Sequence, residues 1–437
     1  MTVTERSAQP RESNTDIHDH PRHPARHETV AERPGTTQRD GFSPARLDRM
    51  HETMRRHVDS GEMPGLVALV HRRGREHIEA IGAMDFGGDA PMRRDTIFRL
   101  ASMTKPITAV GAMILVEECK VRLDDPVDEW LPELSGRRVL RTIDGALDDT
   151  VPAVRPITVR DLLTFRSGYG EVGFHSPTCP LQNAMRELRL PLVEWIFPGT
   201  PDELMRRLGS LPLAHQPGVR WLYHMSSEIL GVLVTRVSGT TLGTFLKERL
   251  FVPLGMNDTD FFVPEAKLDR LPICYGTTFP STELTVLDSA RGGQMSQSPR
   301  FESGAGGLVS TVDDLLAFSR MMLGRDEASG ERILSRPTVE LMTRDHLTPE
   351  QKAASPFFEH FWETRGWGLG MSVVTGRGDI ADVPGRFGWD GAFGTSWHVD
   401  PSEGLVGVLM TQRRPDVLGI ATVVRDFWTS AYQLIED

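Results

Sequence analysis

TIFRLASMTKPITAV, residues 96–110, is the stretch on which the fold and chemistry of this chain depend. It places Ser102 and Lys105 in a Ser-x-x-Lys motif, and residues three apart share one face of a helix, so their Oγ and Nζ atoms can meet. Pro106 is tolerated only in the first turn of a helix, which predicts that the helix begins near Ser102. The helix N-terminus lowers the cost of negative charge on the serine oxygen, and a neutral lysine could take the serine proton. The motif therefore predicts an activated nucleophile, with a surface serine and lysine of no special role as the alternative.

Lysine is rare in this chain, which makes its presence in the motif informative. Five lysines stand against 44 arginines, a bias for which genomic base composition is the plain explanation. Arginine stays protonated in proteins, whereas a buried lysine can lose its proton. A lysine at position 105 therefore fits a role in proton transfer that arginine could not fill.

Length and composition exclude several classes of protein. The chain has 437 residues, 39% of them hydrophobic, which is enough for one large or two medium domains with their own core. Its net charge of −11 argues against a nucleic-acid partner, and no apolar run reaches the roughly 18 residues of a membrane span. Cys119, Cys179 and Cys274 are too few and too widely spaced for a disulfide framework or a zinc motif. The N-terminus lacks the apolar segment of a secretory signal, so we expect a cytoplasmic protein.

Residues 1–44 are polar and lack periodicity, which predicts a disordered tail. The tail contains four histidines, and a metal site there is the alternative to simple solvation. Without a rigid scaffold nothing sets the geometry that a metal needs, so we expect no metal and no other cofactor. The histidines are His18, His20, His23 and His27.

Strand patterns lie near both ends of the chain and helix patterns lie between them. This order predicts an α/β (α+β) protein in which residues of about 45–101 and 301–437 build one antiparallel sheet, and a mainly helical part of about 102–300 is inserted. The expected strands are 65–74 and 75–85, forming a hairpin, then 366–376, 391–401 and 404–413. The expected helices are 44–58, one from about 102, 159–168, 201–211, 226–239, 241–255, 311–323 and 416–435.

Two further motifs could complete a catalytic site. Tyr223 precedes a predicted helix, and a phenol near a lysine ammonium can ionise below its usual pKa of about 10 and relay protons. A packing tyrosine is the alternative, and Tyr169 is the next phenol to consider. The run Trp389-Asp390-Gly391-Ala392 stands at the head of a predicted strand. Gly391 allows a close approach of backbone or substrate, and a backbone N–H there could help to form an oxyanion hole.

Taken together, these motifs resemble the serine β-lactamase and penicillin-binding-protein superfamily on its class C side, most closely the family VIII carboxylesterases and related acyltransferases. The resemblance covers residues 45–437 and implies the class C fold, a central antiparallel sheet flanked by helices plus a helical domain. It implies that Ser102 forms an acyl-enzyme, that Lys105 is its base and that Tyr223 passes the proton to the leaving group. It also implies an oxyanion hole made by the backbone N–H groups of Ser102 and Ala392. Further phrases that carry it are RLDDPVDEWLPEL, DLLTFRSGYG, PLGMNDTDFF and GAGGLVSTVDDLLAFSRMML.

The sequence departs from the lactamases and peptidases of that superfamily at two motifs. Their Tyr-x-Asn is replaced by Tyr223-His224-Met225, and their Lys-Thr-Gly by Trp389-Asp390-Gly391. Met225 cannot orient a substrate amide and Trp389 cannot pair with a carboxylate, so these two residues and Gly391 are expected to line a site for esters. The G-x-S-x-G marker of α/β-hydrolases is absent.

The expected function is therefore a carboxylesterase acting on small or medium acyl esters, with a small-molecule ester as its only expected partner. An acyltransferase and an amide or β-lactam hydrolase are the alternatives. A non-enzymatic binding module is disfavoured because Ser102 and Lys105 are both present. The acyl group, the alcohol and the oligomeric state stay open.

Overall fold

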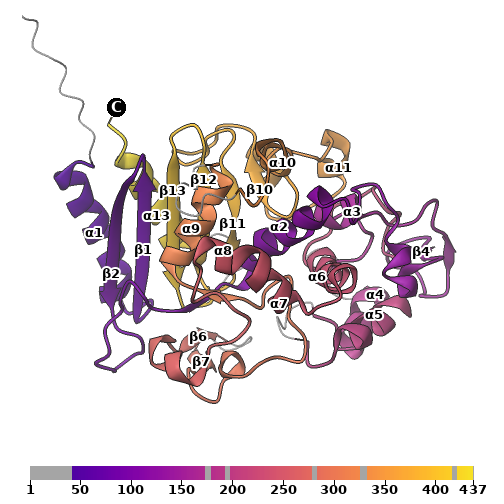
Figure 1. Ribbon diagram of the computed structural model, residues 1–437, viewed down its shortest axis with the longest axis horizontal. Coiled ribbons are helices and arrows are strands. Elements are labelled where there is room, and N and C mark those ends of the chain that lie inside the picture. The colour runs from indigo at the N-terminus through magenta and orange to yellow at the C-terminus, as the bar shows by residue number, and fades with distance from the viewer. Residues whose placement is uncertain are drawn as a thin grey trace, which may run out of the picture. The chain divides into compact units, whose positions relative to one another are not determined.

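A seven-stranded antiparallel sheet is assembled from both ends of the chain (Figure 1). The computed structural model describes residues 42–172, 179–191, 197–277, 283–324, 332–415 and 421–436. The strand order is β2-β1-β13-β12-β11-β10-β9, and β1 pairs with β13 so that Val67 lies opposite Met410. This sheet with its surrounding helices confirms the predicted fold class. The strands of the sheet are β1 Gly65–Arg72, β2 Arg75–Gly82, β9 Arg365–Trp367, β10 Ser372–Val374, β11 Phe387–Gly391, β12 Thr395–Asp400 and β13 Leu405–Thr411.

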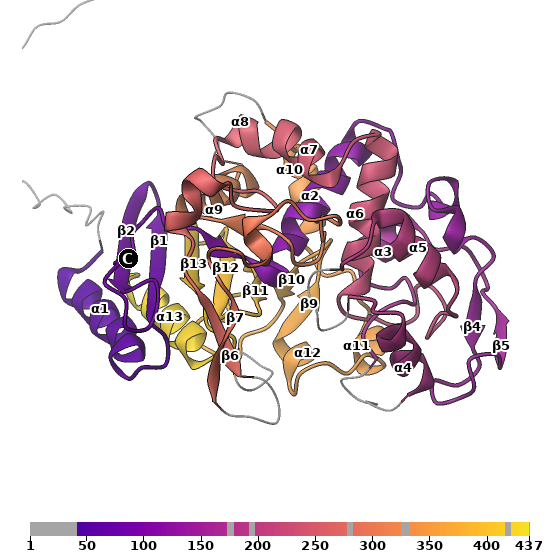
Figure 2. The same ribbon diagram turned by 90° about the horizontal axis from the view of Figure 1, so that it is seen from below.

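Helices fill the middle of the chain and flank the sheet, as the sequence predicts. Those in the described residues are α1 Pro44–Asp59, α2 Thr104–Glu117, α3 Val159–Leu163, α4 Pro180–Glu187, α5 Pro201–Gly209, α6 Met225–Ser238, α7 Leu242–Leu246, α8 Val252–Leu254, α9 Val312–Met322, α10 Arg336–Met342, α11 Pro349–Ala353, α12 Phe361–Thr364 and α13 Thr422–Gln433. Figure 2 shows α12 beside the edge strand β9.

β1 is apolar from Gly65 to Val70 because both faces of the sheet are covered there. Leu66 and Val70 pack in a cluster with residues of α1 and α13 on one face. Val67 and Leu69 belong to the main core on the other face. Successive side chains of a strand point to opposite faces, so a strand covered on both sides needs an unbroken apolar run.

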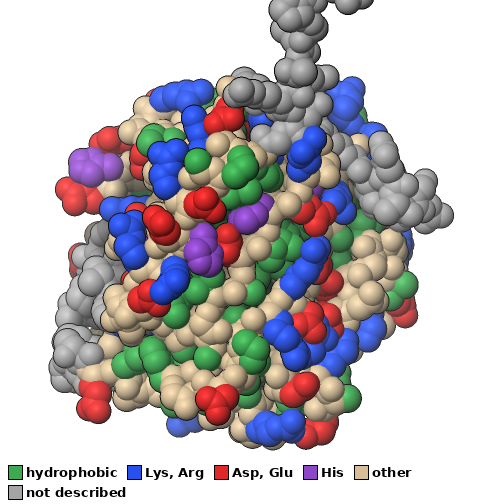
Figure 3. Space-filling model, turned by 90° about the vertical axis from the view of Figure 1, so that its left-hand side faces the viewer, with side chains coloured by type: hydrophobic (Ala, Val, Ile, Leu, Met, Phe, Trp, Pro, Cys, Tyr) green, Lys and Arg blue, Asp and Glu red, His purple; other side chains and the backbone are tan. Residues whose placement is uncertain are grey.

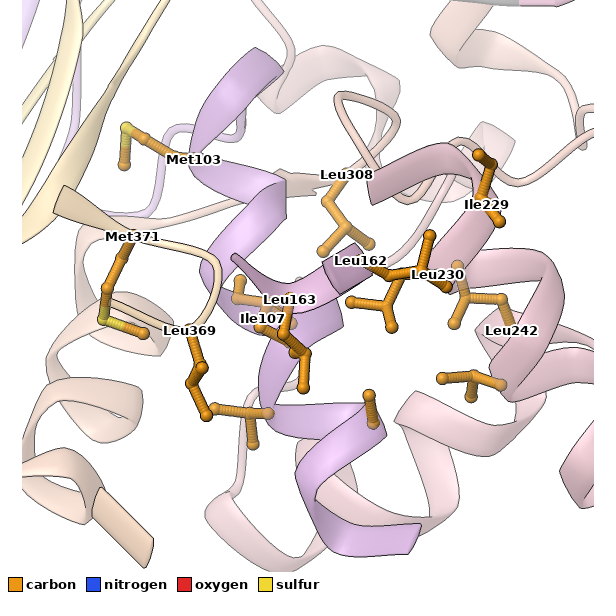
Figure 4. Packing of buried hydrophobic residues seen from close by; sticks show 14 of the residues in the cluster. Met103, Ile107, Leu162, Leu163, Ile229, Leu230, Leu242, Leu308, Leu369 and Met371 are labelled. Atoms are coloured by element: carbon orange, nitrogen blue, oxygen red, sulfur yellow. The ribbon is translucent and has the colours of Figure 1, made fainter. Parts of the chain in front are cut away.

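α2 is buried on nearly all sides, as expected from its sequence, and lies between the sheet and the helical part (Figure 1). Figure 4 shows side chains of α2, α3 and α6, among them Ile107, Leu163 and Leu230, gathered in the main core. A short 3₁₀ turn, η1 Ala101–Met103, precedes α2, and the two-residue strands β3 Phe98–Arg99 and β8 Val309–Ser310 pair just before it. The first turn of α2 is therefore buried and follows directly on η1 and the β3–β8 pair.

Three expected elements are wrong in detail. The stretch 391–401 is the turn and second strand of a hairpin, and 366–376 also folds back on itself, from β9 to β10. Gly394 and Gly370 have φ of +73° and +83°, a left-handed backbone that glycine adopts without strain and that reverses the chain. The expected helix 241–255 is interrupted by a π-helical segment at Lys247–Phe251.

Short strand pairs within the mainly helical part were not expected: β4 Arg138–Leu140 with β5 Thr150–Pro152, and β6 Cys274–Thr277 with β7 Leu284–Asp288. Residues 1–41 of the predicted tail 1–44, with its four histidines, lie outside the described residues, and so does the 416–420 part of the last predicted helix. The first helix begins at Pro44.

The surface over α1 carries charges of both signs, and Figure 3 shows acidic and basic side chains interspersed on that face. Arg55 pairs with Asp59 at 3.0 Å and Arg46 with Glu436 at 3.0 Å, so this is a solvated, ion-paired surface. No single helix among the described residues has the length and apolar composition to cross a membrane; α6 and the Leu242–Leu254 segment meet that test only as a pair bent by 76°.

Candidate active site

Ser102 lies in η1, immediately before α2, and is partly exposed. The preceding residue, Ala101, has a φ of +45°, which a residue with a Cβ rarely adopts. Such strain persists only where the surrounding structure imposes it, and it concentrates at functional sites. Because Ser102 is in the first turn of its helix, its backbone N–H has no partner within that turn. The serine is therefore presented on a strained turn with a free backbone donor beside it.

Lys105 meets the serine as the spacing predicts. Its Nζ donates to Oγ of Ser102 at 2.9 Å and to the carbonyl oxygen of Ala305 at 2.7 Å. The side chain is completely buried. Burial lowers the pKa of Lys105 from 10.5 to about 7, although the negative charges of Glu228 and Glu171 act in the opposite direction. A substantial fraction of Lys105 is therefore neutral near pH 7 and able to accept a proton.

Tyr223 completes a cluster with these two residues. Its hydroxyl hydrogen-bonds to the side chain of Ser102 and accepts a hydrogen bond from Nε1 of Trp389 at 2.8 Å. Nζ of Lys105 lies 4.6 Å from the centre of the Tyr223 ring. The expectation that the lysine eases ionisation of the phenol is wrong, because burial dominates and raises the pKa of Tyr223. Tyr223 therefore stays protonated and can act as an acid.

Tyr169, the other phenol considered, is separate from this cluster. It is buried, and its hydroxyl donates to the carbonyl oxygens of Leu208 at 3.2 Å and Leu211 at 3.3 Å. Burial raises the pKa of Tyr169 to about 12. It has the contacts of a packing tyrosine.

The end of β11 lies against η1, which brings the Trp-Asp-Gly-Ala run to the serine. A Cβ added at Gly391 would lie 2.4 Å from the carbonyl oxygen of Leu100, so only glycine permits this approach. Ala392 follows at the start of the hairpin turn to β12. Its N–H and that of Ser102 thus belong to two chain segments in contact, and their joint role as an oxyanion hole stays a prediction.

Side chains of β11 alternate between the two faces of the sheet. Trp389 is almost fully buried among aromatic rings, with Trp367 at 4.9 Å and Tyr223 at 5.7 Å between ring centres. Asp390 accepts hydrogen bonds from Ser396 at 2.5 Å and His398 at 3.2 Å. Burial alone would favour the neutral acid, but His398 and Ser396 hold the pKa of Asp390 at about 2. Trp389 therefore contacts the candidate site through Tyr223, and Asp390, on the other face of the sheet, is bonded to side chains of β12.

Met225 is the first residue of α6 and is completely buried in the main core. It presents no surface to solvent, so its predicted contact with substrate stays a prediction. The residue between it and Tyr223, His224, has a φ of +78° and lies with Nε2 3.5 Å from Oε1 of Glu228. Burial lowers the pKa of His224, and the charge of Lys105 lowers it further, so the imidazole is neutral near pH 7.

Two acids near Lys105 were missed by the sequence analysis. Glu228 is completely buried and accepts hydrogen bonds from Oγ of Ser303 at 2.7 Å and the N–H of Ala305 at 3.3 Å. An acid inside the apolar helix pattern of 226–239 was the signal that could have found it. Glu171 lies in a loop of irregular sequence and carried no such signal. No cluster of three or more metal-ligating side chains occurs in the described ranges.

Comparison with known proteins finds similar sequences and solved structures that match most of the chain. An uncharacterized protein of Mycobacterium tuberculosis (strain CDC 1551 / Oshkosh) is 40% identical over 385 residues, covering 85% of this chain and 91% of that protein. Esterase EstB of Burkholderia gladioli is 29% identical over 383 residues, covering 84% and 90%. The solved structure of EstCE1, a hydrolase with promiscuous acyltransferase activity, matches with a TM-score of 0.72 at 25% identity, covering 89% of this chain and 98% of that one.

The family model described as Beta-lactamase matches residues 50–424, which include the sheet, the helical part and the serine cluster. This match confirms the resemblance inferred from the motifs, and the fold agrees with it. The chain therefore belongs to the beta-lactamase family.

Proposed function

We propose that this protein is a serine hydrolase that forms an acyl-enzyme on Ser102 and acts as a carboxylesterase on small or medium acyl esters. The observation that carries the proposal is the completely buried Lys105, whose Nζ lies 2.9 Å from Oγ of Ser102 and whose pKa is about 7. A base with a pKa near the working pH is the most effective kind. A lysine with only a structural role would gain nothing from losing its proton.

The geometry supports a two-step reaction. Neutral Lys105 takes the proton of Ser102 as Oγ attacks the ester carbonyl, and the N–H groups of Ser102 and Ala392 stabilise the oxyanion. The C–O bond to the alcohol then breaks, and protonated Tyr223 gives its proton to the leaving alkoxide, recovering one from Lys105. Water enters in place of the alcohol, and as its oxygen attacks the acyl carbon its proton passes through Tyr223 to Lys105. The bond from the acyl carbon to Oγ then breaks, Lys105 returns the proton to Oγ, and the acid is released.

Two features favour esters over β-lactams. Indole has a single N–H donor, and that of Trp389 is already donated to Tyr223 at 2.8 Å. Trp389 thus has no donor left for a lactam carboxylate, and it lacks the charge that a lysine would supply. Met225 has no hydrogen-bonding group for an amide side chain and is buried in the core.

Acyl transfer is the second candidate, because it uses the same acyl-enzyme and differs only in whether water or an alcohol accepts the acyl group. The solved EstCE1 structure, a hydrolase with promiscuous acyltransferase activity, is the observation that favours it. Adding a primary alcohol to the hydrolysis assay separates the two, since an acyltransferase converts the donor ester to a new ester faster than to the free acid.

The nucleophile is tested by labelling with a fluorophosphonate probe and locating the adduct by mass spectrometry. We expect one adduct on Ser102, and Ser102→Ala should lose both labelling and ester turnover. Ser210→Ala, which removes a hydroxyl at the exposed end of α5, is the matched control and should behave as the unmodified protein does. Labelling of another serine in the Ser102→Ala protein would overturn the assignment.

A further inference from the structure

A small cavity of about 120 Å³ adjoins the catalytic cluster on the Tyr223 side. Its wall is mostly apolar and includes Ile143, Val172, Leu222 and Phe357. The charged residues that line it are Glu171 and Arg220, and His215 lines it too. An engineered cavity of about 150 Å³ holds benzene, so this one has room for a short chain of about four to six heavy atoms. Tyr223 both lines the cavity and hydrogen-bonds to Ser102, so the cavity lies beside the nucleophile and is a candidate subsite for part of the ester.

Glu171 is held in the cavity wall by its backbone. Its N–H donates to the carbonyl oxygen of Tyr223 at 3.0 Å. A Cβ at the preceding Gly170 would lie 2.4 Å from Cβ of Leu222 and 2.9 Å from the carbonyl oxygen of Tyr223. The loop at residues 170–171 therefore packs directly against residues 222–223. Glu171 therefore keeps a constant position relative to the phenol.

The carboxyl group of Glu171 has no hydrogen-bond or ion-pair partner among the residues that the structure describes. Burial raises its pKa to about 7, although the charges of Arg186 and Lys105 act in the opposite direction. Glu171 is half-buried, and a partly desolvated carboxyl group without a partner gains a hydrogen bond when a bound group donates one.

We propose that this cavity binds a short aliphatic group carrying a hydroxyl, and that the carboxyl group of Glu171 receives the hydroxyl's hydrogen bond. A neutral hydroxyl fits better than an ammonium, because Lys105 and Arg186 act on Glu171 and Arg220 also lines the cavity, so positive charge is already present. A carboxyl group can bond a hydroxyl in either protonation state, as acceptor when ionised and as donor when protonated. The inference rests on the proposed function, since it names the substrate class of that site.

The hydroxyl can sit on the acyl part or on the alcohol part of the ester, and matched substrates separate the two. For the acyl part, 4-nitrophenyl 3-hydroxybutanoate is compared with 4-nitrophenyl 3-methylbutanoate. For the alcohol part, 2-hydroxyethyl butanoate is compared with propyl butanoate. We expect kcat/KM to favour the hydroxyl member of one pair about tenfold, which is about 1.4 kcal/mol. No preference in either pair, with both esters hydrolysed, would overturn this inference and leave the proposed function standing.

Variants of Glu171 show whether the preference comes from its carboxyl group. Glu171→Leu should abolish the preference, so that kcat/KM for the hydroxyl ester falls to that of its methyl or propyl counterpart, whereas Glu171→Gln, which can still accept a hydrogen bond, should retain part of the preference. Glu363→Leu, a control at an exposed carboxylate of α12, should keep the full preference. Assays at about pH 8.5 keep Lys105 mostly neutral. An equal loss of kcat/KM for both members of a pair would show that Glu171 acts only by changing the pKa of Lys105, and would overturn the inference.

Binding supplies a readout that needs no turnover. In the Ser102→Ala protein, fluorescence of Trp221, which lines the cavity, should report 2-hydroxyethyl butanoate or 3-hydroxybutanoate binding about tenfold more tightly than its methyl counterpart. That difference should vanish when Glu171→Leu is added. A protein that binds the hydroxyl probe preferentially yet labels on no serine would retain this inference and refute the proposed function. Equal affinities for both probes would refute the inference.

Discussion

Replacing Lys105 with methionine should stabilise the folded protein near pH 7 while abolishing its activity. A fall in pKa from 10.5 to about 7 corresponds to about 5 kcal/mol of destabilisation when the lysine is protonated, at 1.36 kcal/mol per pKa unit. Methionine has a similar length and carries no charge, so it avoids this cost. It also leaves the carbonyl oxygen of Ala305 without its donor, which costs about 1–3 kcal/mol. The net expectation is a gain of about 2–4 kcal/mol below pH 7.

The stability of the unmodified protein should rise with pH because folding lowers the pKa of Lys105. In the unfolded chain Lys105 keeps its proton up to its ordinary pKa of 10.5, and in the folded protein it loses the proton above about pH 7. Between these values the unfolded state binds more protons, so the stability of the unmodified protein rises with pH by about 1.4 kcal/mol per unit. The advantage of Lys105→Met should therefore shrink by about 2.7 kcal/mol from pH 7.5 to pH 9.5.

Urea unfolding followed by tryptophan fluorescence at several pH values measures this difference. Lys120→Met is the matched control, because Lys120 is exposed and pairs with Glu118 at the surface, and its effect should be small and nearly independent of pH. A Lys105→Met protein less stable than the unmodified protein near pH 7, or an advantage that stays constant from pH 7.5 to 9.5, would refute burial as the cause of the lowered pKa.

Further predictions concern catalysis. The kcat/KM for a neutral ester should fall below about pH 7 as Lys105 gains its proton. Lys105→Arg should lose about 10³-fold above pH 7, where the native lysine is neutral and the arginine stays protonated. Tyr223→Phe should lose about 10²–10³-fold in kcat with an unchanged melting temperature, whereas Tyr169→Phe should keep its rate; the reverse result would exchange their roles. Gly391→Ala should lose at least about 10²-fold in kcat, because its Cβ would lie 2.4 Å from the carbonyl oxygen of Leu100, and near-normal rates would argue against an oxyanion hole at this hairpin. A short-chain aryl ester should exceed a chromogenic cephalosporin at least about 100-fold in kcat/KM, and comparable values would favour a lactamase.

Local patterns in the sequence predicted the elements that short-range geometry controls. The hairpin of β1 and β2, the helix after Ser102 and the contact between Ser102 and Lys105 involve residues close in the chain, whose relative positions follow from strand and helix repeats. The same reasoning read 366–376 and 391–401 as single strands, because an apolar run with glycine looks alike whether the glycine continues a strand or reverses it. Only the left-handed φ of Gly370 and Gly394 distinguishes the two cases.

The sequence by itself thus predicted the main helices, the fold class and the contact between Ser102 and Lys105. The tertiary structure decided the chemistry of that pair, because desolvation depends on every atom packed around a group. Complete burial brings the pKa of Lys105 to about 7 and raises that of Tyr223, opposite to what the neighbouring charge alone suggested. The hydrogen bond from Trp389 to Tyr223 and the place of Glu171 beside the phenol join loops and strands far apart in sequence, and no spacing rule reaches across such a distance.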